Sequence, residues 1–513
     1  MNYRHLMMAC CALATALHVT SGRAAECEQL SSLKLEHTEI TLAQTVAAGA
    51  FKPPAGSFAA PGMPPPAYSQ LPPFCRVAGT LRPSADSDIR FEVWMPSSNW
   101  NGKFVGVGNG VWAGSITHFA LVEPLSLGYA TAATDDGHQG SPLDASFAAG
   151  HPEKLVDFGH RAVHETAVAA KAIIAAFYDK KASRSLFVSC STGGRQGLME
   201  AHRYPDDYDG ISSMAPANPM TTLMVSSLWT GYATLKDAAS RVPPPKFGVV
   251  HKAAVAACDG DDGVKDGIIS APRSCKFDVA SLQCKGDDGP DCLTAPQVAA
   301  LRAIYQGPRF AGTTKQIYPG FEPGSEALFP AQTMGPEPFA VATTYMKFLV
   351  FKDPKWDFKT FDYGNDVIRA MHIGDEQLDV PPTLNSFLAA GRKLLLSHGW
   401  ADGLIPAMST VKFYTDLARV PGRKKKSLEN ARLFMIPGMG HCAGGDGPFV
   451  FDAISTLDKW VETGRAPERI VVSNPPNAPA RTRPLCSWPQ EAIYSGAGST
   501  DDEKSFKCGV RAP

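Results

Sequence analysis

The sequence predicts an α/β fold in which helices pack on a parallel β-sheet, and three observations predict it. Short apolar segments alternate with helical ones between residues 90 and 202. A long segment without this alternation follows, and two more strand-like segments come after it. Strands separated by helices favour parallel pairing, because each helix returns the chain to the same end of the sheet.

The predicted elements are short. The strand candidates are apolar or alternate in polarity, and they cover residues 90–95, 103–107, 129–134, 185–189, 393–397 and 431–436. Apolar residues at helical spacing predict a helix over 160–178, and further helices are expected over 196–202 and 447–463. A glycine-rich loop, residues 108–114, follows the second strand.

The long segment between the two sets of elements has a different composition. Residues 219–384 are rich in Pro, Gly and Asp and contain four cysteines. We therefore expect them to form an inserted domain, here called the insert, within a main domain made of residues 26–218 and 385–513. The tail beyond residue 463 is expected to be rich in loops.

The first residues are typical of an export signal. An apolar run at 6–19 precedes small residues that suit cleavage near Ala24 or Ala25, so residues 1–25 are predicted to be a signal peptide. A lipoprotein anchored through Cys10 is the alternative. No later run reaches the ~18 apolar residues that a membrane helix needs. The sequence predicts a soluble protein that is secreted or periplasmic.

The composition excludes several classes of protein. Lys and Arg number 49 against 50 Asp and Glu, without a long block of one sign, so neither nucleic acid nor a membrane surface is expected as a partner. A hydrophobic content of 44% is typical of a packed globular protein and excludes a disordered or fibrous chain.

Ten cysteines remain after the signal peptide, and an even number in an exported chain favours five disulfides. The sequence does not fix their connectivity. Neighbours along the chain suggest local pairs, which would leave Cys190 and Cys442 for each other: Cys27 with Cys75, Cys258 with Cys275, Cys284 with Cys292, and Cys486 with Cys508. Zinc is the alternative, but no C-x-x-C pair favours it.

A candidate nucleophile lies between a predicted strand and a predicted helix. The motif Ser189-Cys190-Ser191-Thr192-Gly193 has the strand, tight turn and helix that expose a serine above a sheet. It departs from G-x-S-x-G because Ser189 replaces the first glycine. Alone, the motif is equally compatible with an ordinary turn.

An acid and a base follow in the order that this arrangement requires. Asp402 comes just after the strand at 393–397, and His441 lies on a glycine-rich loop after the strand at 431–436. Ser191 would attack a carbonyl, His441 would move the proton, and Asp402 would fix the imidazole tautomer. A disulfide between Cys190 and Cys442 would then tie the nucleophile loop to the base loop.

Other residues have weaker assignments. His138 precedes the serine and is interpreted as a structural hydrogen-bonding residue, while His398 either lines the pocket or is buried. The expected oxyanion donors are the backbone N–H groups of Thr192 and Gly110. The glycines of the loop at 108–114 are also compatible with a tight turn alone.

These motifs resemble the tannase and feruloyl esterase family. The resemblance rests on Cys-Ser-Thr-Gly-Gly at 190–194, the late Asp402 and Gly-His-Cys at 440–442, and it covers nearly all of the mature chain. It implies an α/β-hydrolase fold with the insert as a lid before the acid. It also implies a serine carboxylesterase that acts on esters of aromatic, feruloyl-type acids, either small molecules or groups attached to plant polysaccharide or polyphenol.

The resemblance leaves the substrate open. A tannase acting on galloyl esters and a terephthalate monoester hydrolase are the alternatives within the family. At Ile405, a predicted substrate contact, some relatives carry an aromatic residue, which disfavours a terephthalate-type clamp. A catalytically silent, calcium-stabilised binding protein on the same fold is the alternative of a different class.

An acidic segment in the insert could bind a cation. Its carboxylates and glycines suit a hard ion, although the spacing is not that of an EF-hand and a solvated acidic turn explains the residues equally well. The family resemblance implies structural calcium, held by the side chains of Asp259, Asp262 and Asp266 and by the carbonyls of Val264 and Ile268.

Overall fold

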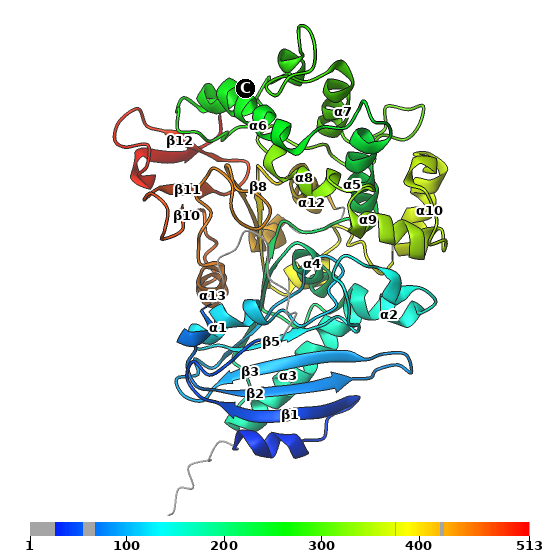
Figure 1. The fold of residues 1–513 in the computed structure, drawn as a ribbon. Coiled ribbons are helices and arrows are strands. Elements are labelled where there is room, and N and C mark those ends of the chain that lie inside the picture. The colour runs from blue at the N-terminus through cyan, green and yellow to red at the C-terminus, as the bar shows by residue number, and fades with distance from the viewer. Residues whose placement is uncertain (1–25, 55–66, 375, 421–424, 512–513) are drawn as a thin grey trace, which may run out of the picture.

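A nine-stranded mixed sheet runs through the molecule in the order β1-β2-β3-β5-β4-β6-β7-β8-β9 (Figure 1). The computed structural model describes residues 26–54, 67–374, 376–420 and 425–511, so the predicted signal peptide and Cys10 lie outside the described residues. The strands are β1 (Thr38–Val46), β2 (Phe74–Leu81), β3 (Ile89–Pro96), β4 (Lys103–Gly106), β5 (Ala130–Thr134), β6 (Arg184–Cys190), β7 (Gly210–Met214), β8 (Lys393–Gly399) and β9 (Ala431–Ile436).

Strand direction divides the sheet into two parts. The pairs β1–β2, β2–β3 and β3–β5 are antiparallel. The pairs from β5 through β4, β6, β7 and β8 to β9 are parallel. All six predicted strands are present, and the prediction of a purely parallel sheet is wrong for the N-terminal part.

Helices cover both faces of the sheet. Along β8, Leu394 and Leu396 belong to one apolar core and Leu395 to another, as expected when successive side chains point to opposite faces. The first core includes residues of α3 (Ala162–Tyr178), α4 (Thr192–Arg203) and α12 (Met408–Arg419). The second includes residues of α1 (Val122–Ser126) and α13 (Ala453–Thr463). This is the α/β-hydrolase arrangement that the family resemblance implies.

The helix predicted from residue 447 begins later. The N–H groups of Phe449 and Val450 donate to the carbonyl of Ser473, which keeps this segment extended. Asp452 then caps α13, because its side chain accepts a hydrogen bond of 2.7 Å from the N–H of Ser455. The tail contains two hairpins rather than loops alone, namely β10 (Arg469–Ser473) with β11 (Thr482–Cys486), and β12 (Glu491–Tyr494) with β13 (Phe506–Gly509).

The insert consists of helices joined by loops, and its described residues contain none of the strands of the sheets. Its helices gather at the opposite end of the molecule from β1, as Figure 1 shows. They are α5 (Met220–Leu235), α6 (Pro244–Cys258), α7 (Ala295–Gln306), α8 (Pro330–Thr333), α9 (Ala340–Thr344) and α10 (Asn365–Gly374). The short α11 (Asn385–Ala389), just after the insert, packs against α4 and β8.

All five suggested disulfide pairs are present, including Cys190 with Cys442. Four of them join cysteines that follow each other along the chain, and the fifth joins the end of β6 to the loop after β9. In the described part of the chain, none of the helices has both the length and the apolar character to cross a bilayer.

Candidate active site

Ser191 lies on the turn between β6, which ends at Cys190, and α4, which begins at Thr192. Its backbone has φ 64° and ψ −126°, a conformation that non-glycine residues rarely adopt and that is found where function requires it. Three backbone hydrogen bonds hold it. Ser191 N–H donates to the Met214 carbonyl at 3.0 Å, and the N–H groups of Arg195 and Ala217 each donate to the Ser191 carbonyl at 3.1 Å.

The structure explains why a serine can replace the first glycine of the motif. A Cβ atom added to Gly193 would lie 1.9 Å from Ser189 Oγ, and one added to Gly108 would lie 3.0 Å from it. The two glycines therefore provide the space that the Ser189 side chain occupies.

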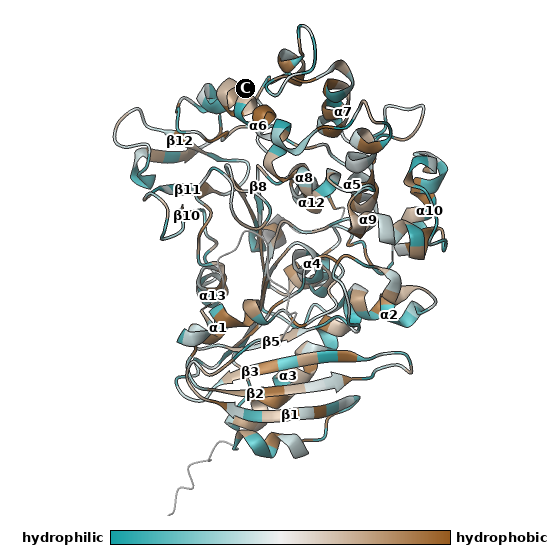
Figure 2. Cartoon of the chain, viewed as in Figure 1, coloured by the Kyte–Doolittle hydropathy of each residue, from teal (hydrophilic) through white to brown (hydrophobic). Residues whose placement is uncertain are grey.

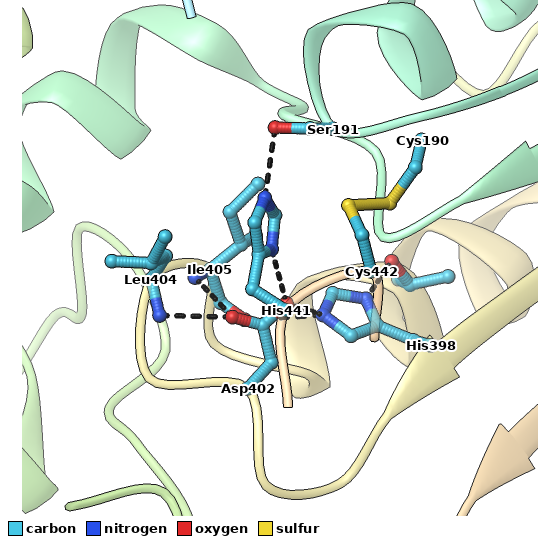
Figure 3. The surroundings of a disulfide bond; sticks show 9 residues. Cys190, Ser191, His398, Asp402, Leu404, Ile405, His441 and Cys442 are labelled. Atoms are coloured by element: carbon cyan, nitrogen blue, oxygen red, sulfur yellow. Dashed lines mark hydrogen bonds and ion pairs between the residues drawn. A yellow bond between two sulfur atoms is a disulfide. The ribbon is translucent and has the colours of Figure 1, made fainter. Parts of the chain in front are cut away.

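The predicted triad residues meet in one hydrogen-bonded chain. His441 Nε2 lies 2.9 Å from Ser191 Oγ, and His441 Nδ1 lies 2.7 Å from Asp402 Oδ2 (Figure 3). Asp402 follows β8 and His441 follows β9, at the same edge of the sheet as Ser191, because these strands run parallel. This geometry suits proton transfer from the serine to the imidazole.

Asp402 is fully buried and remains ionised. Burial alone would raise its pKa, but the charge on His441 and hydrogen bonds from His398 and His441 keep the pKa of this carboxyl well below its ordinary value. The other oxygen, Oδ1, accepts hydrogen bonds from the N–H groups of Leu404 at 2.8 Å and Ile405 at 2.9 Å. A carboxylate held in this way can steady an imidazolium.

His398 does not line a pocket, so the pocket-lining interpretation is wrong. Its side chain has no exposed surface, because β8 extends through Gly399 and His398 points beneath the loop that carries Asp402. Its Nε2 lies 3.1 Å from Asp402 Oδ2 and its Nδ1 lies 2.7 Å from Thr410 Oγ1. Since the carboxylate only accepts, Nε2 carries a proton and donates to Asp402.

Ile405 lies beside His441 in Figure 3. Only 4% of its surface is exposed, and it belongs to the apolar core that contains Trp112 and residues of the insert. Its N–H donates to Asp402. A contact between Ile405 and a substrate stays a prediction.

The Cys190–Cys442 disulfide joins the two loops of the triad. The Cα atoms of the two cysteines are 6.0 Å apart, and each cysteine is the sequence neighbour of a triad residue, Ser191 or His441 (Figure 3). The bridge therefore fixes the distance between the loop that carries the nucleophile and the loop that carries the base.

The two predicted oxyanion donors are available for a ligand. In the described residues, neither the N–H of Thr192 nor that of Gly110 donates a hydrogen bond. Thr192 Oγ1 donates to the Val111 carbonyl at 2.7 Å, which holds the glycine-rich loop against the start of α4.

Gln196 and Asn109, which the sequence analysis missed, clamp this loop. The N–H of Asn109 donates to Gln196 Oε1 at 3.0 Å, and the Asn109 carbonyl accepts a hydrogen bond from the N–H of Gly193 at 2.8 Å. Gln196 Nε2 donates in turn to the buried Asp136 at 2.6 Å. No local sequence pattern reveals this clamp, since it joins segments far apart in the chain.

His138 has a packing role. Its ring stacks on Phe147 with the centroids 3.5 Å apart, and burial lowers its pKa to about 4. The ring is therefore neutral at ordinary pH, which agrees with a structural rather than a catalytic assignment. In the described residues neither ring nitrogen has a hydrogen-bond partner, so packing takes the place of the hydrogen bonding that was predicted.

The acidic segment of the insert folds into a compact loop. Asp259 Oδ1 accepts the N–H groups of Asp266 and Ile268 at 3.0 and 3.2 Å, and Asp262 Oδ1 accepts the N–H of Val264 at 2.8 Å. Asp266 pairs with Arg483 of β11, and burial raises the pKa of Asp266.

Two carbonyls of this loop suit a cation. Within the described ranges, the Val264 and Ile268 carbonyls accept no hydrogen bond, although both residues are buried. The three carboxylates do not all approach one another within 4.8 Å. A cation with ligands at 2.3–2.6 Å on opposite sides does not require such proximity. The donor set therefore fits the calcium that the family resemblance implies.

Comparison with known proteins gives one consistent family. A family model described as "Tannase and feruloyl esterase" matches residues 75–509. An "Uncharacterized esterase" from Xanthomonas campestris pv. campestris is 35% identical over 96% of this chain and 92% of its own length. A "Probable feruloyl esterase B-1" from Aspergillus flavus is 31% identical over 85% of this chain and 86% of its own.

A solved structure extends the similarity to three dimensions. The crystal structure of feruloyl esterase B from Aspergillus oryzae has a TM-score of 0.86 and 28% identity, and the match covers 94% of this chain and 99% of that chain. The similarity therefore includes both the sheet and the insert.

Proposed function

The chain belongs to the tannase and feruloyl esterase family, and on that premise we propose that it hydrolyses esters of hydroxycinnamic, feruloyl-type acids through Ser191. It is a carboxylic ester hydrolase by family. The observation that carries the assignment of the site is the chain from Ser191 Oγ through His441 to the buried carboxylate of Asp402, with distances of 2.9 and 2.7 Å.

The mechanism follows from this geometry. His441 takes the Ser191 proton as the oxygen attacks the ester carbonyl, and Asp402 stabilises the imidazolium that forms. The N–H groups of Thr192 and Gly110 would donate to the oxyanion. His441 then gives the proton to the departing alcohol, which leaves an acyl-enzyme on Ser191. Water activated by the same imidazole releases the acid.

The insert supplies a lid that shapes the acyl pocket in this proposal. Two hydrogen bonds between the insert and loops of the site support it. Trp112, on the glycine-rich loop, donates from Nε1 to the Val341 carbonyl of the insert at 2.9 Å. Gln332 of the insert donates from Nε2 to the Gly403 carbonyl on the acid loop at 2.7 Å.

A substrate panel tests the proposed acyl group. Methyl ferulate should give a higher kcat/KM than methyl gallate or the ethylene glycol monoester of terephthalic acid. A preference for methyl gallate would make the protein a tannase instead, and one for the terephthalate monoester would favour that alternative. A fluorophosphonate probe should label the wild type and leave Ser191→Ala unlabelled. An unlabelled wild type would favour the catalytically silent binding protein.

We propose structural calcium in the insert, held by Asp259, Asp262 and Asp266 and by the carbonyls of Val264 and Ile268. The ion would supply charge neutralisation for the acidic loop and would stabilise only the folded state. A chelator should lower the Tm more than it lowers activity at low temperature. Asp259→Asn should abolish the response to chelator, and the exposed Asp261→Asn should retain it. Loss of activity with an unchanged Tm would contradict this role.

We propose secretion or periplasmic export. The five disulfides support an oxidising compartment. N-terminal sequencing of the exported protein should find a start near Glu26, and a cytosolic chain that retains residues 1–25 would contradict export.

A further inference from the structure

Three side chains converge at the far end of the nucleophile helix. They are His164 of α3, Glu200 of α4 and Asp207 of the loop before β7, and one potential ligand atom of each lies within 4.8 Å of the other two. His164 Nδ1 lies 2.6 Å from Asp207 Oδ2. The His164 ring stacks on Tyr204 with the centroids 3.8 Å apart, which fixes its orientation.

The polar neighbour of Glu200 is another carboxyl, that of Asp207, which cannot stabilise Glu200 as a buried anion. Its surface is 1% exposed, and in the described structure neither carboxyl oxygen makes a hydrogen bond. A polar group buried without a hydrogen bond costs free energy, and a carboxyl in such a place requires a proton or a cation. Glu200 faces the His164–Asp207 pair, so a cation bound there would contact all three side chains.

We propose that His164, Glu200 and Asp207 bind a divalent transition-metal ion of the zinc type. One imidazole nitrogen with two carboxylate oxygens suits zinc, which takes four ligands from nitrogen, oxygen and sulfur. Calcium is disfavoured because it prefers six to eight oxygens. The side chains of His164 and Asp207 are 27% and 12% exposed, so water can reach the fourth position.

Lys171 is the residue that competes with the ion. Its ammonium lies 3.5 Å from Asp207 Oδ1 and also donates to the Asp207 carbonyl. Two carboxylates offset the charge of a divalent ion and leave one positive charge at Lys171. Lys171→Met should therefore tighten zinc binding, since it removes a cation beside the site.

The site is separate from the ester chemistry. Glu200 is eight residues after Thr192, about 12 Å along α4 at 1.5 Å per residue. An ion there would tie α3, α4 and the loop before β7 together, and would stabilise the main domain without contacting substrate. The inference therefore does not depend on the acyl specificity proposed above.

Zinc titration of the full mature protein tests the site. Metal-free protein is supplied with excess Ca²⁺ to saturate the loop in the insert, and Zn²⁺ binding is then measured by calorimetry and by the Tm. The wild type should bind one Zn²⁺ that Glu200→Gln does not bind, and its Tm should rise with Zn²⁺ while that of Glu200→Gln stays unchanged. His151→Asn is the matched control, because His151 pairs with Asp86 at 3.0 Å on the surface without a buried third ligand.

Two further measurements keep the test decisive. If Glu200→Gln does not fold, the partly exposed His164→Asn replaces it and should lose the same ion. Co²⁺ in place of Zn²⁺ reports coordination by its absorption spectrum, which should disappear in the same variants. Equal Zn²⁺ binding by the wild type and Glu200→Gln, or none by the folded wild type, would overturn the proposal and favour a proton shared between the two carboxyls.

Discussion

At the scale of single residues, the acid of the triad has an unusually complete set of donors. Asp402 accepts from two backbone N–H groups and from both His441 and His398, and its own side chain has no exposed surface. A carboxylate that keeps its charge and its position holds the imidazole in one tautomer. His398 is therefore a positioning residue that acts through Asp402.

His398→Phe should lower kcat on methyl ferulate by roughly 10- to 100-fold with little change in KM, since a hydrogen bond to a charged group contributes about 1.5–3 kcal/mol. Steady-state kinetics and a melting curve check this. Thr410→Val is the control, because it removes only the outer hydrogen bond to His398. A loss confined to KM, or an equal loss in the control, would contradict the positioning role.

The triad could be predicted from the sequence, but only some of the residues that hold the site in place could be. Ser191, Asp402 and His441 could be found because their order and their places after strands follow a known chemistry. The burial of His398 could not be read from the sequence, since it depends on how far β8 continues. Gln196 and Asn109 were not predicted, because amide side chains that join distant segments leave no local sequence pattern.

At the scale of elements, α4 and the glycine-rich loop act as one unit. The Gln196 side chain accepts a hydrogen bond from the N–H of Asn109 and donates one to Asp136. Asn109 is the residue before the predicted oxyanion donor Gly110. Gln196→Met keeps the volume and removes these hydrogen bonds, together with that from Gln196 Nε2 to Asn109 Oδ1. We expect kcat to fall by up to about 10²-fold, comparable to the loss of one oxyanion donor, with KM nearly unchanged.

The control for Gln196→Met is on β7, which packs against the same helix. Ser213→Ala removes the hydrogen bond of 2.8 Å from Ser213 Oγ to the Gly194 carbonyl and leaves the loop untouched. If both variants lower kcat equally for each folded molecule, the clamp is not what positions the oxyanion donors.

His251 connects the insert to the loop after β9, which carries His441. Its Nε2 lies 2.8 Å from Asp446 Oδ2, on the loop that follows His441, and its Nδ1 lies 3.1 Å from the buried Glu326. Hydrogen bonds to Asp446 and Glu326 raise the pKa of His251 to about 10. The bridge is therefore an ion pair at neutral pH.

The pH dependence follows from the direction of this shift. A raised pKa in the folded state gives stability that is complete below the unfolded value of about 6.5 and is lost as pH rises towards 10. The Tm difference between the wild type and His251→Gln should thus be larger at pH 6 than at pH 9.5. A difference that stays constant across this range would show that His251 is neutral in the folded protein.

Several elements could not be predicted for physical reasons. The edge strand β1 mixes hydrophobic and hydrophilic residues without clear alternation (Figure 2), because much of it is exposed. The central β7 is short and contains Ser212 and Ser213, which are buried polar residues. The start of α13 depends on pairing with Ser473, a contact that sequence periodicity does not encode.

In the molecule as a whole, the order of the strands determines where the triad residues and the insert lie relative to one another. The sequence predicted most strands of the parallel part, but the order β5-β4-β6-β7-β8-β9 depends on contacts between distant segments. The structure places β7 between β6 and β8, so the insert leaves and returns beside the strands that carry Ser191 and Asp402. This position explains why the insert contacts both the glycine-rich loop and the loop that carries Asp402.

The Cys190–Cys442 bridge should matter more for turnover than for folding. In the chain-entropy model, a loop of this size contributes about 5 kcal/mol, against about 3 kcal/mol for the shorter loop closed by Cys486 and Cys508. Position makes the larger difference, since a displacement of about 1 Å at a reacting group can cost on the order of 100-fold in rate. We expect the double substitution Cys190→Ala with Cys442→Ala to abolish most activity at temperatures where the protein stays folded.

The pair Cys486 and Cys508 is the matched control, because it joins β11 to β13 in the tail, away from the triad residues. Removing it should lower the Tm and leave kcat for each folded molecule nearly unchanged. Turnover and melting curves for both double variants decide the matter, with active sites counted by fluorophosphonate labelling. Equal kcat in the two variants would mean that the hydrogen bonds around Ser191 and His441 hold the catalytic geometry without the bridge.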